Sequence, residues 1–278
     1  MKTGTLFLFL LLPGVLPAAE WELAWSDEFD QPGLPDPAKW GYEEGFVRNA
    51  ELQYYTRGRQ ENARVEDGML VIEGRKERYK NPKYRPESTK WIASREYADY
   101  TAASLTTQST ASWRYGRVEV RAKIPQGKGV WPAIWMLGVD KEHVGWPACG
   151  EIDIMEFVGK DPNHIYGTVH YATAKKHKSS HGKLETDSPY ADFHIYAMEW
   201  RPDRMDFFFD GTKYHAFQID EAGKGEDNPF RRPQYLILNL ALGGSWGGEM
   251  DDTVLPRKFQ IDYVRVYQES TKSAPSAP

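Results

Sequence analysis

Three carboxylates stand close together on an otherwise apolar stretch, Glu151-Ile152-Asp153-Ile154-Met155-Glu156. A stretch of this type predicts a buried β-strand, and the side chains of a strand alternate between two faces. Glu151 and Asp153 then share a face, and one extra residue, a β-bulge, would return Glu156 to the same side. Carboxylates held side by side repel one another and raise at least one pKa. That arrangement suits acid and nucleophile chemistry better than a structural role.

The chemistry that fits this pattern is the cleavage of a glycosidic bond. A retaining glycosidase uses two carboxyl groups about 5–5.5 Å apart. In this interpretation Glu151 attacks the anomeric carbon, while Glu156 protonates the leaving oxygen and then activates water. Asp153 would hydrogen-bond Glu151 and keep Glu156 protonated by like-charge repulsion. The alternatives are a calcium site or a solvated acidic strand, although calcium sites usually draw their oxygens from loops.

The rest of the chain predicts the strands that must hold these acids. Residues 115–124 alternate apolar and charged side chains, as in a half-exposed strand of an antiparallel sheet. Asp67-Gly68 and Asp210-Gly211 each lie between strand-like runs and predict hairpin turns. With 18 Pro and 24 Gly punctuating short strands, the pattern predicts an all-β fold of two stacked antiparallel sheets with little helix.

Two polar stretches break the strand pattern. Residues 75–95 are rich in Lys and Arg around two prolines, which predicts a basic surface loop; contact with an anionic polysaccharide is the functional alternative. Residues 172–188 are also polar and predict a second exposed loop, beside the cleft. The alternative for this stretch is metal binding by His177 and His181.

The two ends of the chain differ from its middle. An apolar run and small residues within residues 1–19 predict a secretory signal peptide, with a membrane anchor as the alternative. Residues 270–278, rich in Ser, Ala and Pro, predict a disordered tail. Residues 20–269 then form one catalytic β-sandwich domain of a protein secreted to the outside of the cell or to the periplasm. The single Cys149 excludes an internal disulfide and is interpreted as a buried structural thiol.

The charge and the aromatic content of the chain indicate which kinds of molecule it can bind. A formal net charge of −5 argues against nucleic acid and anionic membranes, and we expect a monomer. Ten Trp and sixteen Tyr favour carbohydrate binding, because aromatic rings stack on the C–H faces of sugars, although they also fill cores.

Several motifs together resemble one known family. They include Trp25-Ser26-Asp27-Glu28-Phe29, Glu51-Leu52-Gln53-Tyr54-Tyr55-Thr56, Gly129-Val130-Trp131-Pro132-Ala133-Ile134-Trp135-Met136, Gly167-Thr168-Val169-His170 and Ile261-Asp262-Tyr263-Val264-Arg265-Val266-Tyr267. In this order, and with the acidic hexapeptide, they resemble glycoside hydrolase family 16, and within it the laminarinase-like endo-β-1,3-glucanases. The inserted Met155 matches the bulged version of the family motif and disfavours the lichenase-type branch, which lacks this residue.

The resemblance implies a fold and an activity. The fold would be the concanavalin-like jelly-roll β-sandwich, with one concave sheet forming an open cleft. The activity would be retaining endo-hydrolysis, by double displacement, of β-1,3-glucosidic bonds in laminarin-type glucans, with mixed-linked β-1,3-1,4-glucans as a candidate second substrate. The alternatives are an agar- or carrageenan-type galactan hydrolase, a transglycosylase that uses the same residues, and a non-catalytic β-1,3-glucan-binding protein. Retention of all three acids argues against the last.

The resemblance also implies sugar-binding residues. Trp131 and Trp135, four apart on one strand, face the same way, and Trp131 would be a sugar platform near the cleavage point. His170 resembles the cleft histidine near the acid/base, where it would bond Glu156 or the leaving sugar. The full set of predicted substrate-binding residues is Trp131, Trp135, His170, Asn49, Trp113 and Trp246. A core position is the alternative for each tryptophan, and a satisfied buried side chain is the alternative for the histidine.

Calcium is the only metal that the resemblance suggests. The ligands of a structural Ca²⁺ would be Glu28, the carbonyl of Gly68 and Asp262, away from the cleft. Asp262 shares the predicted face of Val264 and Val266, which is unusual for a carboxylate without a partner. The two-carboxylate mechanism needs no catalytic metal or other cofactor.

Overall fold

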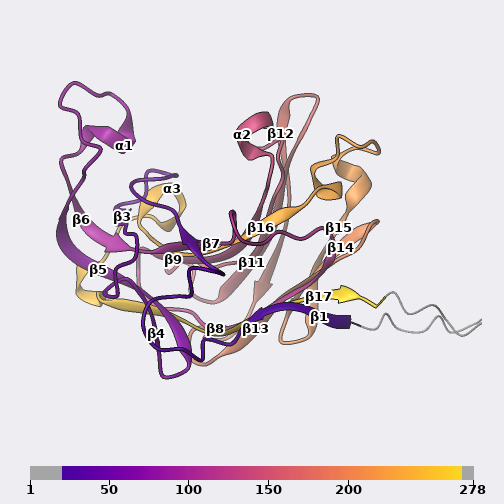
Figure 1. The fold of residues 1–278 in the computed structure, drawn as a ribbon, viewed down its shortest axis with the longest axis horizontal. Helices are drawn as coiled ribbons and strands as arrows, with labels where there is room; N and C mark the ends of the chain where they lie inside the picture. The colour runs from indigo at the N-terminus through magenta and orange to yellow at the C-terminus, as the bar shows by residue number, and fades with distance from the viewer. Residues whose placement is uncertain (1–20, 271–278) are drawn as a thin grey trace, which may run out of the picture.

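Two β-sheets packed face to face make up the protein, as seen in a computed structural model that describes residues 21–270 (Figure 1). Strands β1 and β17, at the two ends of this range, pair with each other, with Trp21 opposite Glu269. The predicted signal peptide and nearly all of the predicted tail lie outside the described residues. Within the described part, no helix has the length and apolar character needed to cross a membrane.

The larger sheet has the order β15-β14-β13-β8-β17-β5-β6-β3, with β1 beside β17 and β4 beside β5. All of its pairs are antiparallel except β3 with β6. Its strands are β1 (Trp21–Asp27), β3 (Gln53–Tyr55), β4 (Ala63–Glu66), β5 (Met69–Lys80), β6 (Tyr97–Ala102), β8 (Gly116–Lys123), β13 (His194–Trp200), β14 (Arg204–Phe209), β15 (Thr212–Gln218) and β17 (Arg257–Glu269).

The smaller sheet has the order β12-β11-β10-β9-β16-β7-β2 and is antiparallel throughout the described residues. Its strands are β2 (Gly41–Tyr42), β7 (Ser104–Thr106), β9 (Val130–Gly138), β10 (Glu151–Glu156), β11 (His164–Thr173), β12 (Lys176–Glu185) and β16 (Gln234–Leu242). The helices described are single turns: α1 (Trp91–Ser94), α2 (Lys141–Val144), α3 (Gly244–Gly247), η1 (Ile219–Ala222), η2 (Pro229–Arg231) and η3 (Asp252–Val254). The prediction of an all-β sandwich with little helix is confirmed.

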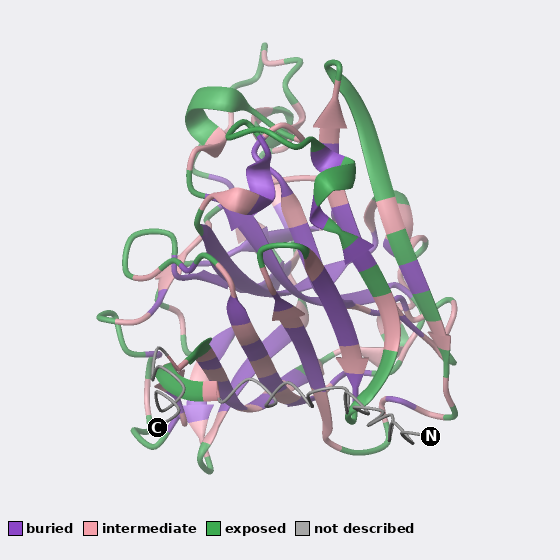
Figure 2. Cartoon of the chain, turned by 90° about the vertical axis from the view of Figure 1, so that its right-hand side faces the viewer, coloured by how far each residue is buried: buried purple, intermediate pink, exposed green. Residues whose placement is uncertain are grey.

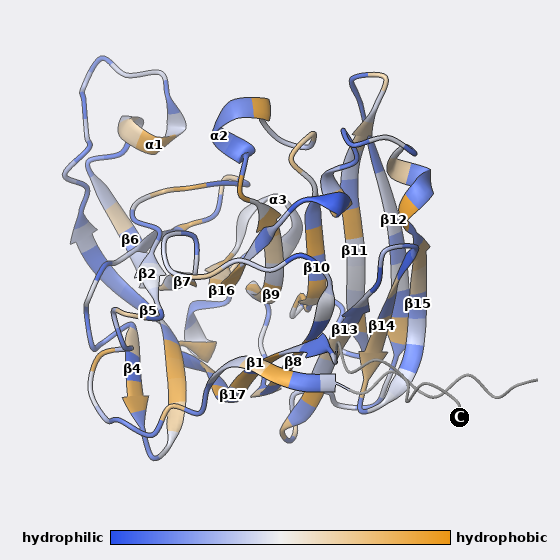
Figure 3. Cartoon of the chain, turned by 45° about the vertical axis from the view of Figure 1, so that its right-hand side comes forward, coloured by the Kyte–Doolittle hydropathy of each residue, from blue (hydrophilic) through white to orange (hydrophobic). Residues whose placement is uncertain are grey.

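Alternating burial along the strands produces the core between the sheets. In β8 every second residue is buried, including Val118, Val120 and Ala122, while the charged residues between them are partly exposed. Figure 2 shows burial concentrated in the strands and exposure in loops and edge strands, and Figure 3 shows the matching bands of hydropathy. The predicted strand over residues 115–124 is therefore confirmed.

Both predicted hairpin turns are present. Asp67-Gly68 joins β4 to β5 and Asp210-Gly211 joins β14 to β15. All four residues have positive φ, 52° and 72° in the first turn and 46° and 77° in the second. Two consecutive positive φ angles are typical of the type I′ turns that match the twist of a hairpin.

Both polar stretches that were interpreted as loops contain strands. The basic stretch 75–95 begins within β5, which runs to Lys80, and only the segment that follows is a loop carrying α1. The stretch 172–188 contains the whole of β12 (Lys176–Glu185), an edge strand that pairs with β11 over ten residues. Its residues are polar because one side of an edge strand faces solvent, and a polar edge strand resembles a loop in sequence.

The predicted bulge in β10 is confirmed and lies at Ile154 and Met155. These two residues stand opposite the single Gly167 of β11, because the register passes from Asp153–Thr168 to Glu156–Tyr166. Both bulge side chains are at most 1% exposed and belong to the main core. The extra residue therefore keeps the apolar pair in the core and returns Glu156 to the other face.

The bulge side chain should contribute strongly to stability. We expect Met155→Ala to lower the free energy of unfolding by about 2–5 kcal/mol, because it leaves a cavity in a packed core. Denaturant titration followed by tryptophan fluorescence measures this change. Leu23→Ala is the control, since Leu23 is 56% exposed on β1 and its truncation should change stability little. Equal losses in the two variants would contradict the packing role of Met155.

Candidate active site

An open cleft lies on the face of the smaller sheet that points away from the larger one. Alternate side chains of strand β9 line the cleft, namely those of Trp131, Ala133, Trp135 and Leu137. The side chains of Val130, Ile134 and Met136 point the other way and pack in the core. Beside β9, β10 presents its three acids. The residues lining the cleft are Val47, Arg48, Asn49, Glu51, Trp131, Ala133, Trp135, Leu137, Lys141, Trp146, Glu151, Asp153, Glu156 and Asn239.

The three acids share one desolvated environment but differ in their partners. Burial, followed by the negative charges of Asp153 and Glu151, raises the pKa of Glu156 well above its ordinary value. Burial and then Glu151 do the same to the pKa of Asp153. Burial also raises the pKa of Glu151, but His170, Arg48 and a hydrogen bond from Trp146 oppose that rise. Glu151 is thus the acid best supported in the ionised form, whereas the pKa values of Glu156 and Asp153 are shifted toward the protonated form.

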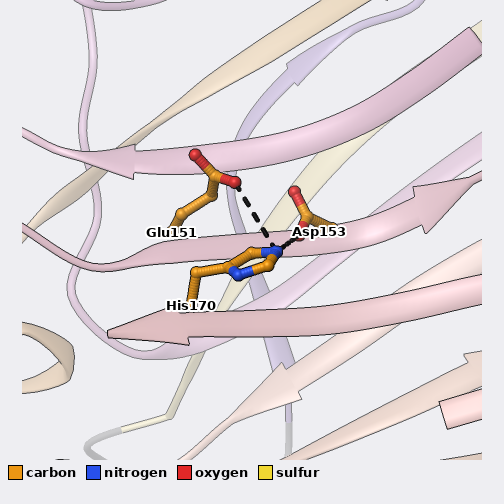
Figure 4. Close-up of side chains that lie close together, drawn as sticks. All are labelled: Glu151, Asp153 and His170. Carbon is orange, nitrogen blue, oxygen red and sulfur yellow. Dashed lines mark ion pairs between the residues drawn. The ribbon is translucent and has the colours of Figure 1, made fainter. Parts of the chain in front are cut away.

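His170 lies beside Glu151 and Asp153 rather than beside Glu156, which corrects the prediction (Figure 4). Its Nε2 is 3.4 Å from Asp153 Oδ2 and 3.9 Å from Glu151 Oε1. The reason is register: His170 pairs across the sheet with Glu151, and Tyr166 takes the place opposite Glu156. The expected hydrogen bond between Asp153 and Glu151 is absent among the described residues, and Asp153 has the imidazole as its neighbour instead.

Trp146 is a cleft residue that the sequence reasoning missed. It follows α2 in the loop that leads to β10, is 50% exposed, and donates a hydrogen bond from Nε1 to Glu151 Oε2 at 3.1 Å. Its ring lies 4.8 Å from that of His177 on β12. The sequence does place this large aromatic residue only five positions before the first acid, Glu151, which could have suggested a cleft position. The sequence of a loop does not, however, determine the direction in which a side chain points.

The opposite wall of the cleft is a polar network around Arg48 and Glu51, which the sequence analysis also left without roles. The guanidinium of Arg48 lies 4.8 Å from the Trp135 ring centre and pairs with Glu43. Glu51, 2% exposed, accepts hydrogen bonds from Gln53 and Tyr55. Burial raises the pKa of Glu51, while Arg48 opposes the rise.

The predicted aromatic platforms divide between cleft and core. Trp131 lines the cleft and donates from Nε1 to Glu156 Oε1 at 3.0 Å, and Trp246 of α3 stands edge-on to it with ring centres 5.4 Å apart. Trp135 also lines the cleft, donating to Asn239 Oδ1 at 2.7 Å beneath Arg48. Trp113 was predicted wrongly, because it packs on Trp25 in the core between the sheets.

Asn49 lies at the cleft wall, as predicted. It has a φ of +54° and donates from Nδ2 to Glu51 Oε1 at 3.4 Å. Positive φ is uncommon for residues other than Gly but is tolerated by Asn. Its backbone therefore turns sharply at the cleft, and sugar binding by its amide stays a prediction.

The residues expected to bind calcium have arginine partners. Glu28 accepts two hydrogen bonds from Arg265, and Asp262 pairs with Arg121 at 2.6 Å. A bulge between Ile261 and Tyr263 turns Asp262 away from the core, which explains its place among apolar neighbours. Calcium binding at Glu28, Gly68 and Asp262 stays a prediction, and a bound Ca²⁺ would have to displace these arginines.

Comparison with known proteins identifies the class. The family model described as glycosyl hydrolases family 16 matches residues 51–265, so the chain belongs to this family and is a glycoside hydrolase. It is 45% identical over 265 residues to a beta-glucanase of Rhodothermus marinus, covering 90% of this chain and 86% of that protein. The solved laminarinase of Rhodothermus marinus is similar with a TM-score of 0.78 at 42% identity, covering 91% and 99%.

A second similar structure comes from work on enzymes that break down mucin rather than on a laminarinase. A solved structure from work on the endo-acting O-glycanases with which human gut microbiota initiate mucin breakdown has a TM-score of 0.85. It is 40% identical and covers 93% of this chain and 94% of that one.

The hydrogen bond from Trp146 should set the ionisation of Glu151. Trp146→Phe keeps an aromatic ring but removes the donor that lowers the pKa of Glu151. The pKa of Glu151 should rise, so the acidic limb of the pH profile of kcat/KM should move to higher pH. Trp91→Phe on α1 is the matched control, because Trp91 packs on Phe46 and lies outside the cleft lining. An unchanged acidic limb in Trp146→Phe would show that the hydrogen bond has no catalytic consequence.

Proposed function

We propose that this protein is a retaining endo-glycosidase that hydrolyses β-1,3-glucosidic bonds of laminarin-type glucans. The observation that supports the mechanism is the unequal environment of two glutamates on one face of one strand. Glu151 is surrounded by the partners that favour an anion, whereas Glu156 is buried beside two other acids. A nucleophile needs the first condition and a general acid needs the second.

The proposed reaction takes two steps. Glu151 attacks the anomeric carbon and forms a glycosyl–enzyme bond, while Glu156 gives its proton to the leaving sugar oxygen. Glu156, now an anion, then removes a proton from water, which attacks the same carbon and releases the sugar from Glu151. Asp153 assists by raising the pKa of Glu156, and the indole N–H of Trp131 holds the Glu156 carboxyl in place. No metal is needed for either step.

Two features support a glucan substrate. The curated relative at 45% identity is a beta-glucanase and the R. marinus structure is a laminarinase. The cleft also carries Trp131 and Trp135 on β9 and Trp146 after α2, and tryptophan rings are suited to stacking on pyranose rings. Mixed-linked β-1,3-1,4-glucan is the proposed second substrate. We further propose that the protein acts as a monomer outside the cell or in the periplasm.

A second candidate function has a specific observation in its favour. The TM-score of 0.85 to a structure from work on mucin O-glycanases exceeds the 0.78 to the laminarinase, although the identities are similar. An endo-acting O-glycanase would use the same three acids and differ in the sugars that the cleft walls accept. The agar- and carrageenan-type galactans remain the third possibility for the same mechanism.

The test is a parallel assay of reducing-sugar release on laminarin, lichenan, barley β-glucan, agarose, κ-carrageenan and mucin O-glycans. We expect short oligosaccharides from laminarin, because an open cleft cuts within a chain, and none in the Glu151→Gln control. Release from mucin O-glycans without release from laminarin would replace the glucan by the second candidate. Binding to laminarin without release from any of the six would contradict the proposed hydrolysis.

Glu156→Gln separates the acid/base from the nucleophile. We expect kcat on laminarin to fall by about 10²–10⁴-fold, the usual contribution of a general acid–base. An aryl glycoside whose leaving group needs no protonation should still form the intermediate, and added azide should restore turnover as a glycosyl azide of retained configuration. An azide product of retained configuration from Glu151→Gln, or an inverted one from Glu156→Gln, would overturn the two assignments.

A further inference from the structure

Glu151, Asp153 and His170 bring three potential metal ligands together (Figure 4). One carboxylate oxygen from each acid and one imidazole nitrogen lie within 4.8 Å of one another. The shortest of the measured separations joins His170 Nε2 to Asp153 Oδ2, at 3.4 Å, and His170 Nε2 lies 3.9 Å from Glu151 Oε1. Donor atoms about 2.0–2.2 Å from one metal ion in a tetrahedral site are about 3.3–3.6 Å apart. The His170–Asp153 separation fits this geometry, and metal binding would draw Glu151 closer to both.

An unsatisfied acceptor points into this cluster. Asp153 is 4% exposed, and its Oδ2 is buried without a hydrogen-bond partner among the described residues. A buried acceptor that lacks a donor carries a desolvation cost. A cation placed between Asp153 Oδ2 and His170 Nε2 would remove that cost, so the cluster favours a positively charged ligand.

Neighbouring side chains already orient the donors as a metal site requires. His177 Nε2 lies 2.9 Å from His170 Nδ1. His177 can therefore accept a proton from Nδ1 when a metal ion displaces the proton of Nε2, which frees the Nε2 lone pair on the side of the acids. Trp146 donates to Glu151 Oε2, which leaves Oε1, on the side of His170, free to coordinate. Metal ligands are typically held by such outer hydrogen bonds, and these fix both the tautomer and the orientation.

We propose that Glu151, Asp153 and His170 bind a divalent transition-metal ion, Zn²⁺ or Cu²⁺, which reversibly inhibits the enzyme. Two carboxylates and one imidazole suit these ions. Ca²⁺ and Mg²⁺ fit less well, because they take oxygen ligands, and Ca²⁺ takes six to eight of them. The ion would occupy the carboxylate proposed as the nucleophile, so metal and glycan would compete for it. Binding itself depends only on these donors and not on which polysaccharide the enzyme cleaves.

The first measurement is calorimetric titration of ZnCl₂ into the Glu156→Gln protein without substrate. This variant keeps the three donors, and we expect one ion per chain. Adding Asp153→Asn or His170→Asn should weaken binding by at least about tenfold, and His177→Phe by about 10–100-fold through the lost outer hydrogen bond. His181→Gln is the matched control, since His181 lies on the same strand but outside the cluster. MgCl₂ should give no comparable heat.

The second measurement is inhibition. Zn²⁺ should lower the rate of the wild-type enzyme by raising the apparent KM, and a chelator should restore it. Absence of Zn²⁺ binding to Glu156→Gln would overturn the proposal, as would equal affinity in the Asp153→Asn or His170→Asn proteins. Circular dichroism spectra identical to that of wild type exclude misfolding as the cause of weak binding. Because binding is measured without substrate, failure of the glucanase proposal leaves this result interpretable.

Discussion

The bulge in β10 reconciles two demands that one regular strand could not meet. The core requires Ile152, Ile154 and Met155, while the cleft requires the three acids, and strict alternation would send Glu156 into the core. The bulge also places a requirement on the neighbouring strand β11, where Gly167 lies opposite the two bulge residues. A Cβ at that glycine would lie 2.5 Å from the hydroxyl oxygen of Tyr214 and 3.1 Å from the Phe207 ring. The catalytic face therefore depends on close packing beneath it.

That packing also sets the electrostatics. Because the strand lies in the middle of the smaller sheet, between β9 and β11, its acids are desolvated together. Burial alone would raise all three pKa values and give no division of labour. The asymmetry comes from partners at one end of the strand, where Trp146, His170 and Arg48 favour the anion of Glu151. At the other end Glu156 receives a single indole hydrogen bond from Trp131.

What the sequence predicted well was encoded locally. The hairpin turns, the alternation of β8 and the bulge each depend on residue types only a few positions apart. What it predicted poorly depends on long-range pairing. His170 was placed near the wrong glutamate because only the β10–β11 register decides its neighbour. Trp113 was predicted as a sugar platform, but the packing of the two sheets buries it, and a single tryptophan in a sequence does not show which of the two environments it occupies. The partner of Asp262 comes from β8, more than a hundred residues earlier.

The cleft therefore has two parts with different physical origins. The floor, made by β9 and β10, is fixed by sheet register and core packing, and it carries the chemistry. One wall comes from the α2 loop and the edge strand β12, which stand side by side in Figure 1 and meet where Trp146 contacts His177. These elements are more exposed, and β12 pairs with a neighbouring strand, β11, on one edge only. Changes there can alter which sugar lies against Glu151 without disturbing the bulge, because among the described residues α2 and the loop after it place none in the main core cluster, and β12 packs only Leu184 against it. The floor can thus keep its geometry while the wall changes, and the sugars that fit against Glu151 depend on that wall.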